Sequence, residues 1–540
     1  MKTPIAFGVA LALLVLWPGW TWPLTAMIGD EGLETWAHAW GLAWFADSLM
    51  SGSLPWAVDG LAHPRGGVLW YIDPLGALLT LPVNVLLGPV AAFNLVAVVE
   101  VVLAGAAGML YGRALGGPGW VAGAACATTP WLLGELHNAI QEACWIGLIP
   151  LAGWAAVSGK RWAGAVVGLA ALATPYHGVS AALIVTAHLA FRPRELIRAG
   201  VLAAVVALPP FLVMQASMGG ELALASKAPV AINLGVLRIN ATDWVALFTP
   251  GDFWTVDFDA PLNPPFRRTP YLGAVVALGA LAGVYRRPRH AWLLVPVVVG
   301  VSFCLGPYLW HDGDFVRTAD GALLALPFRW FQQALSVPME HPLRFVAMAV
   351  VALAGLADVG ARGSLAPLIA LLVVLEHLLV APNPWPLNTS PAEVPEVYDH
   401  LEDDGLAVID LPADRGTSFG TSRYLFWQAR HGHPLPYASK VSSEGYPSMN
   451  HALRTWTALG RLHPLPPEAP GTPPANADLP AAVDELREEG FGYVVVHPDL
   501  MAADHMTNTH VSALTGLLGP PEVVAGRYLW RLSSGTSERR

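Results

Sequence analysis

Charged residues are scarce in this sequence. Only 13% of the 540 residues are Asp, Glu, Lys or Arg, against about 25% in an average soluble domain, whereas 54% are hydrophobic. One soluble core cannot bury so much apolar surface, so we expect lipid to solvate much of the chain. The formal net charge of −10 argues against a nucleic-acid partner, because binding the phosphate backbone requires a basic surface.

Cysteine is also scarce, and motifs for nucleotides are absent. Cys126, Cys144 and Cys304 all lie in apolar stretches, and an odd, buried set is neither a disulfide framework nor a zinc site. The sequence has no glycine-rich phosphate loop ending in Lys-Ser or Lys-Thr, and no His-Glu-x-x-His zinc motif. We therefore expect any chemistry to use a substrate that arrives through the bilayer rather than a soluble nucleotide.

Apolar stretches recur along the first 381 residues. The composition predicts about eleven membrane-spanning helices, the first of them retained rather than cleaved as a signal peptide. Their approximate limits are 4–22, 90–112, 116–133, 142–158, 163–176, 178–191, 199–216, 270–285, 291–309, 342–359 and 364–381. The stretch 74–88 is shorter and contains Pro82 and Gly88, so we expect it not to span the membrane.

Basic residues in the short loops set the predicted orientation. When 74–88 is taken as non-spanning, these residues fall at the ends of the spans on one side of the membrane. They are Lys2, Arg113, Lys160, Arg161, Arg192, Arg194, Arg198, Arg286, Arg287, Arg289 and Arg362. The positive-inside rule then places the N-terminus in the cytoplasm and puts 23–89, 217–269, 310–341 and 382–540 outside.

The last part of the chain has a different pattern. Short β-branched runs alternate there with amphipathic stretches, which is typical of a small α/β domain. The expected strands are 405–412, 491–498 and 523–532, and the expected helices are 394–404 and 479–489. We therefore predict an all-α polytopic membrane domain over 1–381, with interfacial helices in its first outer loop (23–89), and a soluble extracytoplasmic α/β domain over 382–540.

The first outer loop opens with three acidic residues, Asp30, Glu31 and Glu34. In a helix over 31–50, Asp30 and Glu34 would lie at its start, where the helix dipole favours anions. Tryptophan recurs every fourth residue on one face of this helix, which predicts an interfacial helix with its indoles at the level of the lipid headgroups. The stripe consists of Trp36, Trp40 and Trp44. The acids either cap and anchor this helix or contact a substrate at the membrane surface.

The same loop ends in Asp73-Pro74. Asp followed by Pro is a good helix start, because Asp caps the free N–H groups and Pro suits the first turn. However, Asp30 and Asp73 bracket one loop at one membrane face. Two carboxylates there could hold a divalent cation such as Mg²⁺ or Mn²⁺, or divide the roles of base and orienting group. His63, in the middle of the loop, is a candidate for substrate binding.

Two further places offer polar groups at the outer face. Glu135 and His137 lie in a short loop between apolar helices, where they are either solvated or line the same outer cavity. Arg344 begins the tenth expected span, where a fixed guanidinium suits a phosphate headgroup unless it only snorkels to the interface. Arg329, on another expected interfacial helix, is a second candidate for the same role.

The order of these motifs resembles the GT-C superfamily of membrane glycosyltransferases, which use polyprenyl-phosphate-linked sugars. More narrowly, it resembles a bacterial branch with a C-terminal extracytoplasmic domain. The residues that carry the resemblance extend over nearly the whole chain: Gly29-Asp30, Trp36, Trp40, His63-Pro64, Gly67, Asp73-Pro74, Gly88-Pro89, Asn94, His137 to Trp145, Pro150-Leu151, Asp243-Trp244, Pro250, Tyr271-Leu272-Gly273, Leu305-Gly306-Pro307, Pro342 to Phe345, Val397-Tyr398, Asp410-Leu411-Pro412, His431 to Pro434 and Gly492 to His497.

The resemblance implies a catalytic acid in the first outer loop, which is Asp30 here, acting on an acceptor hydroxyl while a lipid phosphate leaves. Asp73 and Glu135 compete for the second carboxylate, and Asp30-Glu31 stands where the family has Asp-x-Asp, which puts metal dependence in doubt. The implied function is sugar transfer from a polyprenyl-phosphate-linked donor to a glycan, lipid or protein acceptor outside the cytoplasm, in a bacterial inner membrane. The alternatives are a flippase for a lipid-linked glycan and a non-catalytic envelope scaffold.

Overall fold

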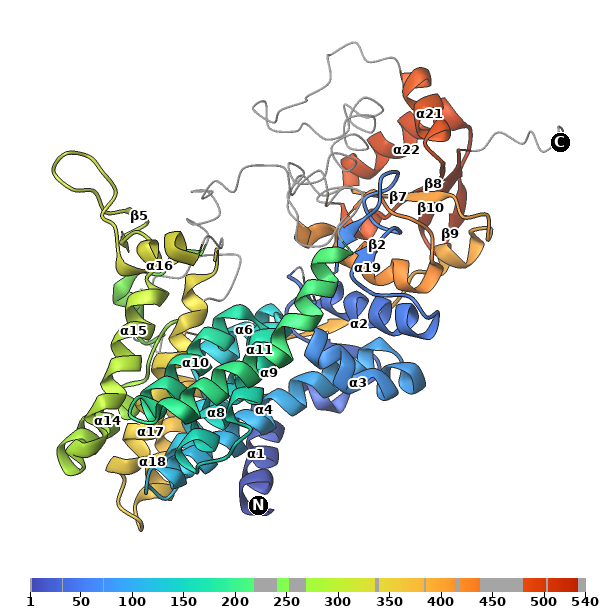
Figure 1. Ribbon diagram of the computed structural model, residues 1–540. Helices are drawn as coiled ribbons and strands as arrows, with labels where there is room; N and C mark the ends of the chain where they lie inside the picture. The colour runs from blue at the N-terminus through green and yellow to red at the C-terminus, as the bar shows by residue number, and fades with distance from the viewer. Residues whose placement is uncertain are drawn as a thin grey trace. The chain divides into compact units, whose positions relative to one another are not determined.

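The computed structural model describes residues 2–31, 33–70, 72–217, 240–251, 269–335, 339–382, 385–412, 418–437, 479–501 and 504–532 (Figure 1). Contacts between residues divide the chain into two compact units. Unit 1 comprises Met1–Glu31, Ile72–Val213 and Val230–Pro391, and unit 2 comprises Gly32–Tyr71, Met214–Pro229 and Ala392–Arg540. Each unit is described below by itself.

Unit 1 is mostly helical, as predicted for this part of the chain, and it also contains two short two-stranded sheets, β1-β6 and β4-β5. Several of its helices begin with proline in the first turn, where the missing N–H costs nothing. The helices are α1 (Lys2–Val15), α3 (Pro74–Leu87), α4 (Pro89–Ala114), α5 (Trp120–Thr128), α6 (Pro130–Asn138), α7 (Gln141–Cys144), α8 (Leu148–Val157), α9 (Ala163–Ala173), α10 (Pro175–Leu189), α11 (Pro193–Ala216), α14 (Ala274–Arg286), α15 (Leu294–Cys304), α16 (Pro327–Leu335), α17 (Val346–Gly360) and α18 (Ala366–Leu379).

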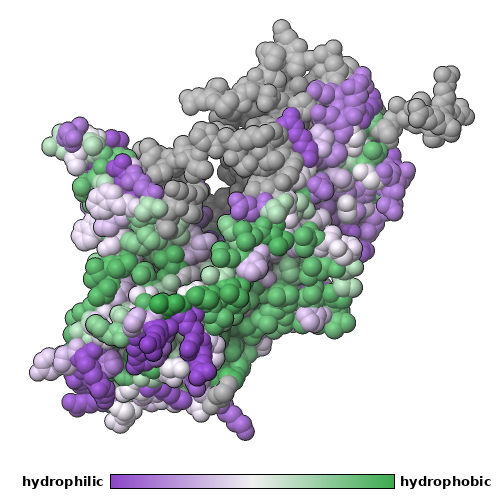
Figure 2. All heavy atoms as spheres, viewed as in Figure 1, coloured by the Kyte–Doolittle hydropathy of each residue, from purple (hydrophilic) through white to green (hydrophobic). Residues whose placement is uncertain are grey.

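Three helical segments are long and apolar enough to cross a membrane: Pro89–Ala114, Pro193–Ala216 and Pro342–Gly360. The first and third are largely buried within the protein, whereas α11 exposes most of its apolar side chains. Figure 2 shows hydrophobic residues gathered over the helices of unit 1. An apolar surface of this kind needs lipid to cover it, because water does not solvate it favourably. The chain is therefore a membrane protein.

The predicted count of eleven spans is not confirmed. Within the described ranges, the other apolar helices are too short to cross by length alone, and Lys2–Val15, Pro74–Leu87, Ala163–Ala173, Ala274–Arg286, Pro288–Cys304 and Ala366–Leu379 are among them. Two helix boundaries in the structure also differ from the predicted ones, for a local reason. Thr129-Pro130 and Thr174-Pro175 each end one helix and start another, because the residue before proline avoids the helical conformation.

Polar side chains make contacts at both ends of α4. At its C-terminal end, Arg113 lies near Asp358, whose carboxylate accepts hydrogen bonds from the backbone N–H groups of Gly119 and Val121. Asn94, near its N-terminal end, is about 28 Å from Arg113 by helix rise and bridges the backbone next to Asp30. Which end of α4 faces the cytoplasm stays a prediction.

Unit 2 contains a four-stranded sheet in the order β7-β8-β10-β9. β7 (Ala407–Leu411) and β8 (Phe491–Val496) are parallel and fully buried, whereas β10 (Arg527–Arg531) pairs antiparallel with β8 and with β9 (Glu522–Val524). The accompanying helices are α2 (Thr35–Met50), α19 (Ser418–His431), α21 (Leu479–Glu488) and α22 (Asp504–Leu518). The predicted small sheet domain is thereby confirmed.

The tryptophan stripe of α2 corrects the prediction of an interfacial helix. Trp36 and Trp40 are only 2% and 1% exposed, because α2 packs on α19. The Trp40 indole donates a hydrogen bond to the Gln428 side chain at 2.8 Å, and the Arg423 guanidinium lies 4.3 Å from the Trp36 ring centroid. The stripe is therefore a protein contact rather than a headgroup anchor.

This contact also changes how the chain divides. The sequence places 32–71 in the membrane domain and the boundary at 381/382, whereas the structure groups 32–71 with the C-terminal unit and ends unit 1 at Pro391. One expected helix, 394–404, is reduced to a short 3₁₀ turn, η6 (Glu396–His400). Proline at 395 holds an extended backbone there, so the turn cannot extend towards the N-terminus.

Candidate functional site

Asp30 follows a short strand in unit 1. This strand, β1 (Ala26–Ile28), pairs antiparallel with β6 (Thr389–Pro391). The Asn94 side chain accepts a hydrogen bond from the backbone N–H of Ile28 at 3.0 Å, and the backbone N–H of Asp30 donates to the carbonyl of His137 at 2.8 Å. The backbone that carries Asp30 is therefore fixed by contacts to three distant parts of the chain.

The Asp30 carboxylate is oriented by two side chains. Its Oδ2 lies 3.1 Å from His137 Nε2 and accepts a hydrogen bond from the Asn388 amide at 2.8 Å. The His137 side chain is almost fully buried, whereas that of Asp30 is 28% exposed. A carboxylate that is held in place yet open to solvent can orient an incoming hydroxyl and accept its proton.

Asp73 is buried and caps α3, as one of the two sequence interpretations expected. Its Oδ1 accepts hydrogen bonds from the backbone N–H of Gly76 at 3.0 Å and from the Trp145 indole at 2.9 Å. Its backbone adopts the left-handed conformation (φ 38°), which Asp tolerates better than most residues. The side chain thus positions the start of α3 and is not open to a substrate in this structure.

We predict that Gly76→Ala disrupts the Asp73 cap. A Cβ at position 76 would lie 1.9 Å from Asp73 Oδ2, so the carboxylate would have to move and leave Trp145 and the helix start without their partner. The loss should be about 2 kcal/mol in the free energy of unfolding. Thermal unfolding in detergent measures it. Gly200→Ala is the matched control, since a Cβ at this site in α11 has no atom within 4 Å; no difference between the two variants would contradict the prediction.

Arg344 forms a buried ion pair with Glu142. The guanidinium Nη2 lies 3.3 Å from the Glu142 carboxylate, and each side chain is about one-tenth exposed. The Arg344 guanidinium also lies 5.5 Å from the ring centroid of Tyr176, whose hydroxyl accepts a hydrogen bond from the backbone N–H of His341. Arg344 is therefore held against two partners and is not a snorkelling side chain.

A single stretch of unit 1, residues 135–145, connects these groups. His137 contacts Asp30, Glu142 contacts Arg344 and Trp145 contacts Asp73. The carboxylates of Asp73, Glu100, Glu135 and Glu142 are also close enough to act electrostatically on the thiol of Cys144. Asp30, Asp73 and Arg344, which are far apart in the sequence, thus each contact a residue of this stretch.

The other candidates have contacts elsewhere. The Glu34 carboxylate lies 3.2 Å from His38 Nε2 in unit 2, and His63 Nε2 lies 2.7 Å from the carbonyl of Glu489. Glu31 is exposed. The Arg329 guanidinium lies 5.4 Å from the ring centroid of Tyr308 in unit 1.

The described residues do not offer the ligands of a resident divalent cation. Across the ranges given above, no three side chains of His, Cys, Asp or Glu lie close enough together to hold a metal ion. The Oδ2 of Asp30 faces an amide donor and an imidazole.

Sequence reasoning missed two side chains of this arrangement. Asn388 orients Asp30 from a segment 358 positions away, and Glu142 pairs with Arg344. The sequence position of Glu142 could have indicated its pairing, because an acid that directly precedes an apolar stretch needs a partner. Nothing in the sequence indicates a role for Asn388, since single asparagines are common in loops.

One sequence motif lies at the edge of the described residues. Residues 416–420 read Gly-Thr-Ser-Phe-Gly, the Gly-x-Ser-x-Gly spacing of hydrolase nucleophile elbows. This stretch reaches into the start of α19, and its side chains lie outside the described residues.

Comparison with known proteins gives matches among solved structures only. No family model matches the chain, and no curated protein matches it. The apo form of an oligosaccharyltransferase from Archaeoglobus fulgidus has 12% identity and a TM-score of 0.47, covering 92% of this chain and 69% of that chain. The archaeal oligosaccharyltransferase from this organism in complex with an inhibitory peptide and a dolichol-phosphate has 12% identity and a TM-score of 0.43, with the same coverage.

Their TM-scores lie below 0.5, so these neighbours carry no argument on the superfamily of this chain. They do not bear on the bacterial branch. At this identity and structural similarity the match carries no weight on function, which is inferred below from the residues of the site.

Proposed function

We propose that this protein is an integral membrane glycosyltransferase that moves a sugar from a polyprenyl-phosphate-linked donor to an acceptor on the extracytoplasmic side. The observation that carries the proposal is the Asp30 carboxylate, which is oriented by His137 and Asn388 and still open to solvent. In this proposal the chain lies in a bacterial inner membrane with its N-terminus in the cytoplasm and unit 2 outside.

The proposed reaction is a single displacement at the anomeric carbon of the donor. The acceptor hydroxyl oxygen attacks this carbon, its proton passes to Asp30, and the bond from the carbon to the phosphate oxygen breaks. The lipid phosphate leaves with the electron pair of that bond. An active-site acid that accepts a proton in this way typically accelerates a reaction by about 10²- to 10⁴-fold.

Arg344 supplies the positive charge for the leaving phosphate in this proposal. An arginine suits that role, because its fork of N–H donors matches two phosphate oxygens. In the structure the guanidinium is paired with Glu142, so the phosphate would have to share or displace this carboxylate. The pairing keeps the charge in place while no donor is bound.

The arrangement favours an enzyme over the two alternatives. A transporter tends to concentrate ionisable groups at the membrane midplane between internal repeats, whereas the pairs here lie near the ends of helices and on the short segments that join them. A scaffold that has lost catalysis has no need of a carboxylate that is both oriented and open to solvent.

The proposal is tested with a deletion strain of the organism that encodes this chain. We expect the envelope glycan to lose one kind of sugar residue, as measured by mass spectrometry, and the matching polyprenyl-phosphate sugar to accumulate in the lipid extract. Re-expression of the wild-type chain should reverse both changes. An unchanged glycan and lipid extract would support a scaffold. Accumulation of the donor confined to the inner leaflet would support a flippase.

A further inference from the structure

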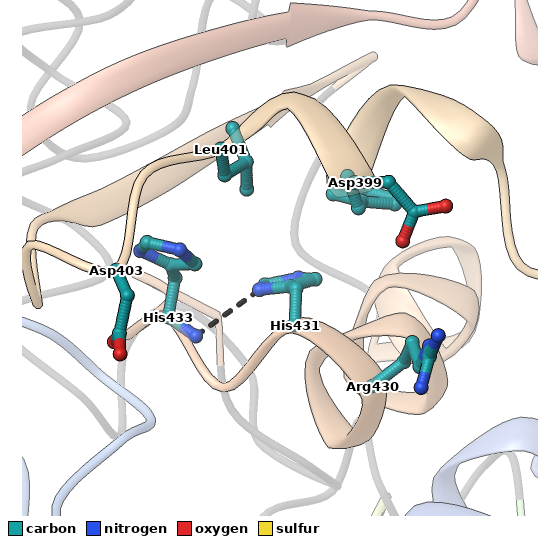
Figure 3. Close-up of a pocket in the computed structure, with 7 residues that line it drawn as sticks. Asp399, Leu401, Asp403, Arg430, His431 and His433 are labelled. Atoms are coloured by element: carbon teal, nitrogen blue, oxygen red, sulfur yellow. Dashed lines mark hydrogen bonds between the residues drawn. The ribbon is translucent and has the colours of Figure 1, made fainter.

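Unit 2 contains a polar cavity that the proposed reaction does not use. It has a volume of about 380 Å³ and is lined by Tyr398, Asp399, Leu401, Asp403, Arg430, His431 and His433 (Figure 3). Cavities of this size are at the small end of those that bind small molecules. Figure 3 shows His431 between His433 on one side and Asp399 and Arg430 on the other.

The end of α19 fixes the imidazole of His431. Gly432, with φ 75°, takes the left-handed position that ends a helix and turns the chain back. As a result, the backbone N–H of His433 donates a hydrogen bond to His431 Nδ1 at 3.1 Å. The ring of Tyr398 stacks on the His431 imidazole, with the centroids 4.6 Å apart and the planes at 19°.

Among the described residues, these contacts leave one ring nitrogen of His431 without a hydrogen-bond partner. Burial lowers the pKa of His431 to about 4, so the imidazole is neutral at physiological pH. Because Nδ1 accepts a hydrogen bond, the proton must lie on Nε2. Nε2 is buried and has no hydrogen-bond partner among the described residues. The imidazole therefore shapes the wall of the cavity and does not present a donor to it.

The floor of the cavity is held by a buried network. The Tyr398 hydroxyl donates to Asp410 Oδ1 at 2.7 Å, and His497 Nε2 lies 3.0 Å from the same oxygen. Arg527 Nε donates to His497 Nδ1 at 3.1 Å, so His497 must carry its proton on Nε2 and donate it to Asp410. Such a network keeps the Tyr398 ring, and with it His431, in one position before any ligand binds.

The chemistry of the lining separates ligand classes. The side chains of Asp399 and Asp403 only accept hydrogen bonds when ionised, whereas Arg430 only donates. A phosphate, which offers acceptors only, would meet two carboxylates against one guanidinium and be repelled. Sugar hydroxyls both donate and accept, so neighbouring hydroxyls of one ring can satisfy both kinds of group.

We propose that this cavity binds one neutral sugar residue of a glycan, held by Asp399, Asp403 and Arg430, with Tyr398 and His431 forming part of its wall. The assignment of that glycan as the acceptor rests on the proposed function, whereas the cavity and its preference for a neutral sugar do not. Unit 2 then selects the acceptor by recognising a sugar next to the one that receives the transferred residue.

The test is saturation-transfer NMR on the full chain in lipid nanodiscs. The probes are the methyl glycosides of mannose, galactose and glucose, and the pooled neutral oligosaccharides released by mild acid from the envelope of the encoding strain. We expect saturable binding of at least one probe. The double variant Asp399→Asn/Asp403→Asn should weaken it roughly tenfold or more, because bonds to charged groups are lost. Arg430→Gln should also weaken it.

Glu488→Gln is the control, since Glu488 is an exposed acid on α21 that does not line the cavity. It should bind as the wild type does. The inference is overturned if no neutral probe binds, if glucose 1-phosphate binds more tightly than glucose, or if the cavity variants bind unchanged. Asp30→Asn separates the two proposals: it should keep sugar binding while losing transfer. Transfer without binding at the cavity contradicts this inference alone, and binding without transfer in the wild type contradicts the proposed function alone.

Discussion

Replacing Asp30 with asparagine is expected to lower sugar transfer by roughly 10²- to 10⁴-fold, because the acceptor hydroxyl loses the group that takes its proton. The fold should survive. Asparagine has the same shape, and its amide oxygen can take the place of Oδ2 beside the Asn388 amide and His137. The measurement is the restoration of the envelope glycan in the deletion strain, with membrane levels of the variant checked by immunoblot.

The control for this experiment is Asp320→Asn, an identical change at an exposed turn of unit 1. It should restore the glycan fully. If Asp30→Asn also restores it fully, Asp30 is not the catalytic acid. Asn388→Ala and His137→Gln are positioning variants. They should lower transfer less than Asp30→Asn and move its pH profile, because they change the surroundings of the carboxylate without removing it.

The membrane helices were the most predictable part of the fold. The spans expected at 90–112 and 342–359 match helical segments Pro89–Ala114 and Pro342–Gly360 within two residues. A long apolar run has few alternatives, because a backbone in lipid must satisfy its own hydrogen bonds. The shorter runs were less predictable, since a helix that packs inside the protein does not need the full length of a span.

The tryptophan stripe shows where periodicity stops being informative. Its spacing correctly predicted that Trp36 and Trp40 share one face of a helix, but an apolar face does not specify whether lipid or protein covers it. The partner, α19, is almost 400 positions later in the chain. Nothing local to 31–50 distinguishes Gln428 as the acceptor for the Trp40 indole.

For the candidate site, too, the sequence indicated single residues but not the long-range contacts between them. Asp30, Asp73, His137 and Arg344 could be selected one by one, because each is polar beside an apolar stretch. Their pairing could not, since it depends on tertiary contacts between segments more than 70 positions apart. The capping role of Asp73 was predictable from Asp-Pro alone, and the structure shows that role.

The ion pair of Arg344 and Glu142 gives the second large effect. Arg344→Met should lower the free energy of unfolding by about 3–5 kcal/mol, because it leaves the Glu142 carboxylate buried without its counter-charge. The double variant Arg344→Met/Glu142→Leu should recover most of this loss, since apolar residues of similar volume replace a buried pair with little cost. Thermal unfolding in detergent measures both.

The double variant also separates a structural role of Arg344 from a role in catalysis. If Arg344 holds the donor phosphate, the double variant is stable but transfers slowly, and the apparent KM for the donor rises. If Arg344 serves only the fold, stability and transfer recover together, and the proposed role is wrong. Arg192→Met is the control: it breaks the exposed pair with Glu195, 3.5 Å apart, and should change stability by less than about 1 kcal/mol, because water screens that pair.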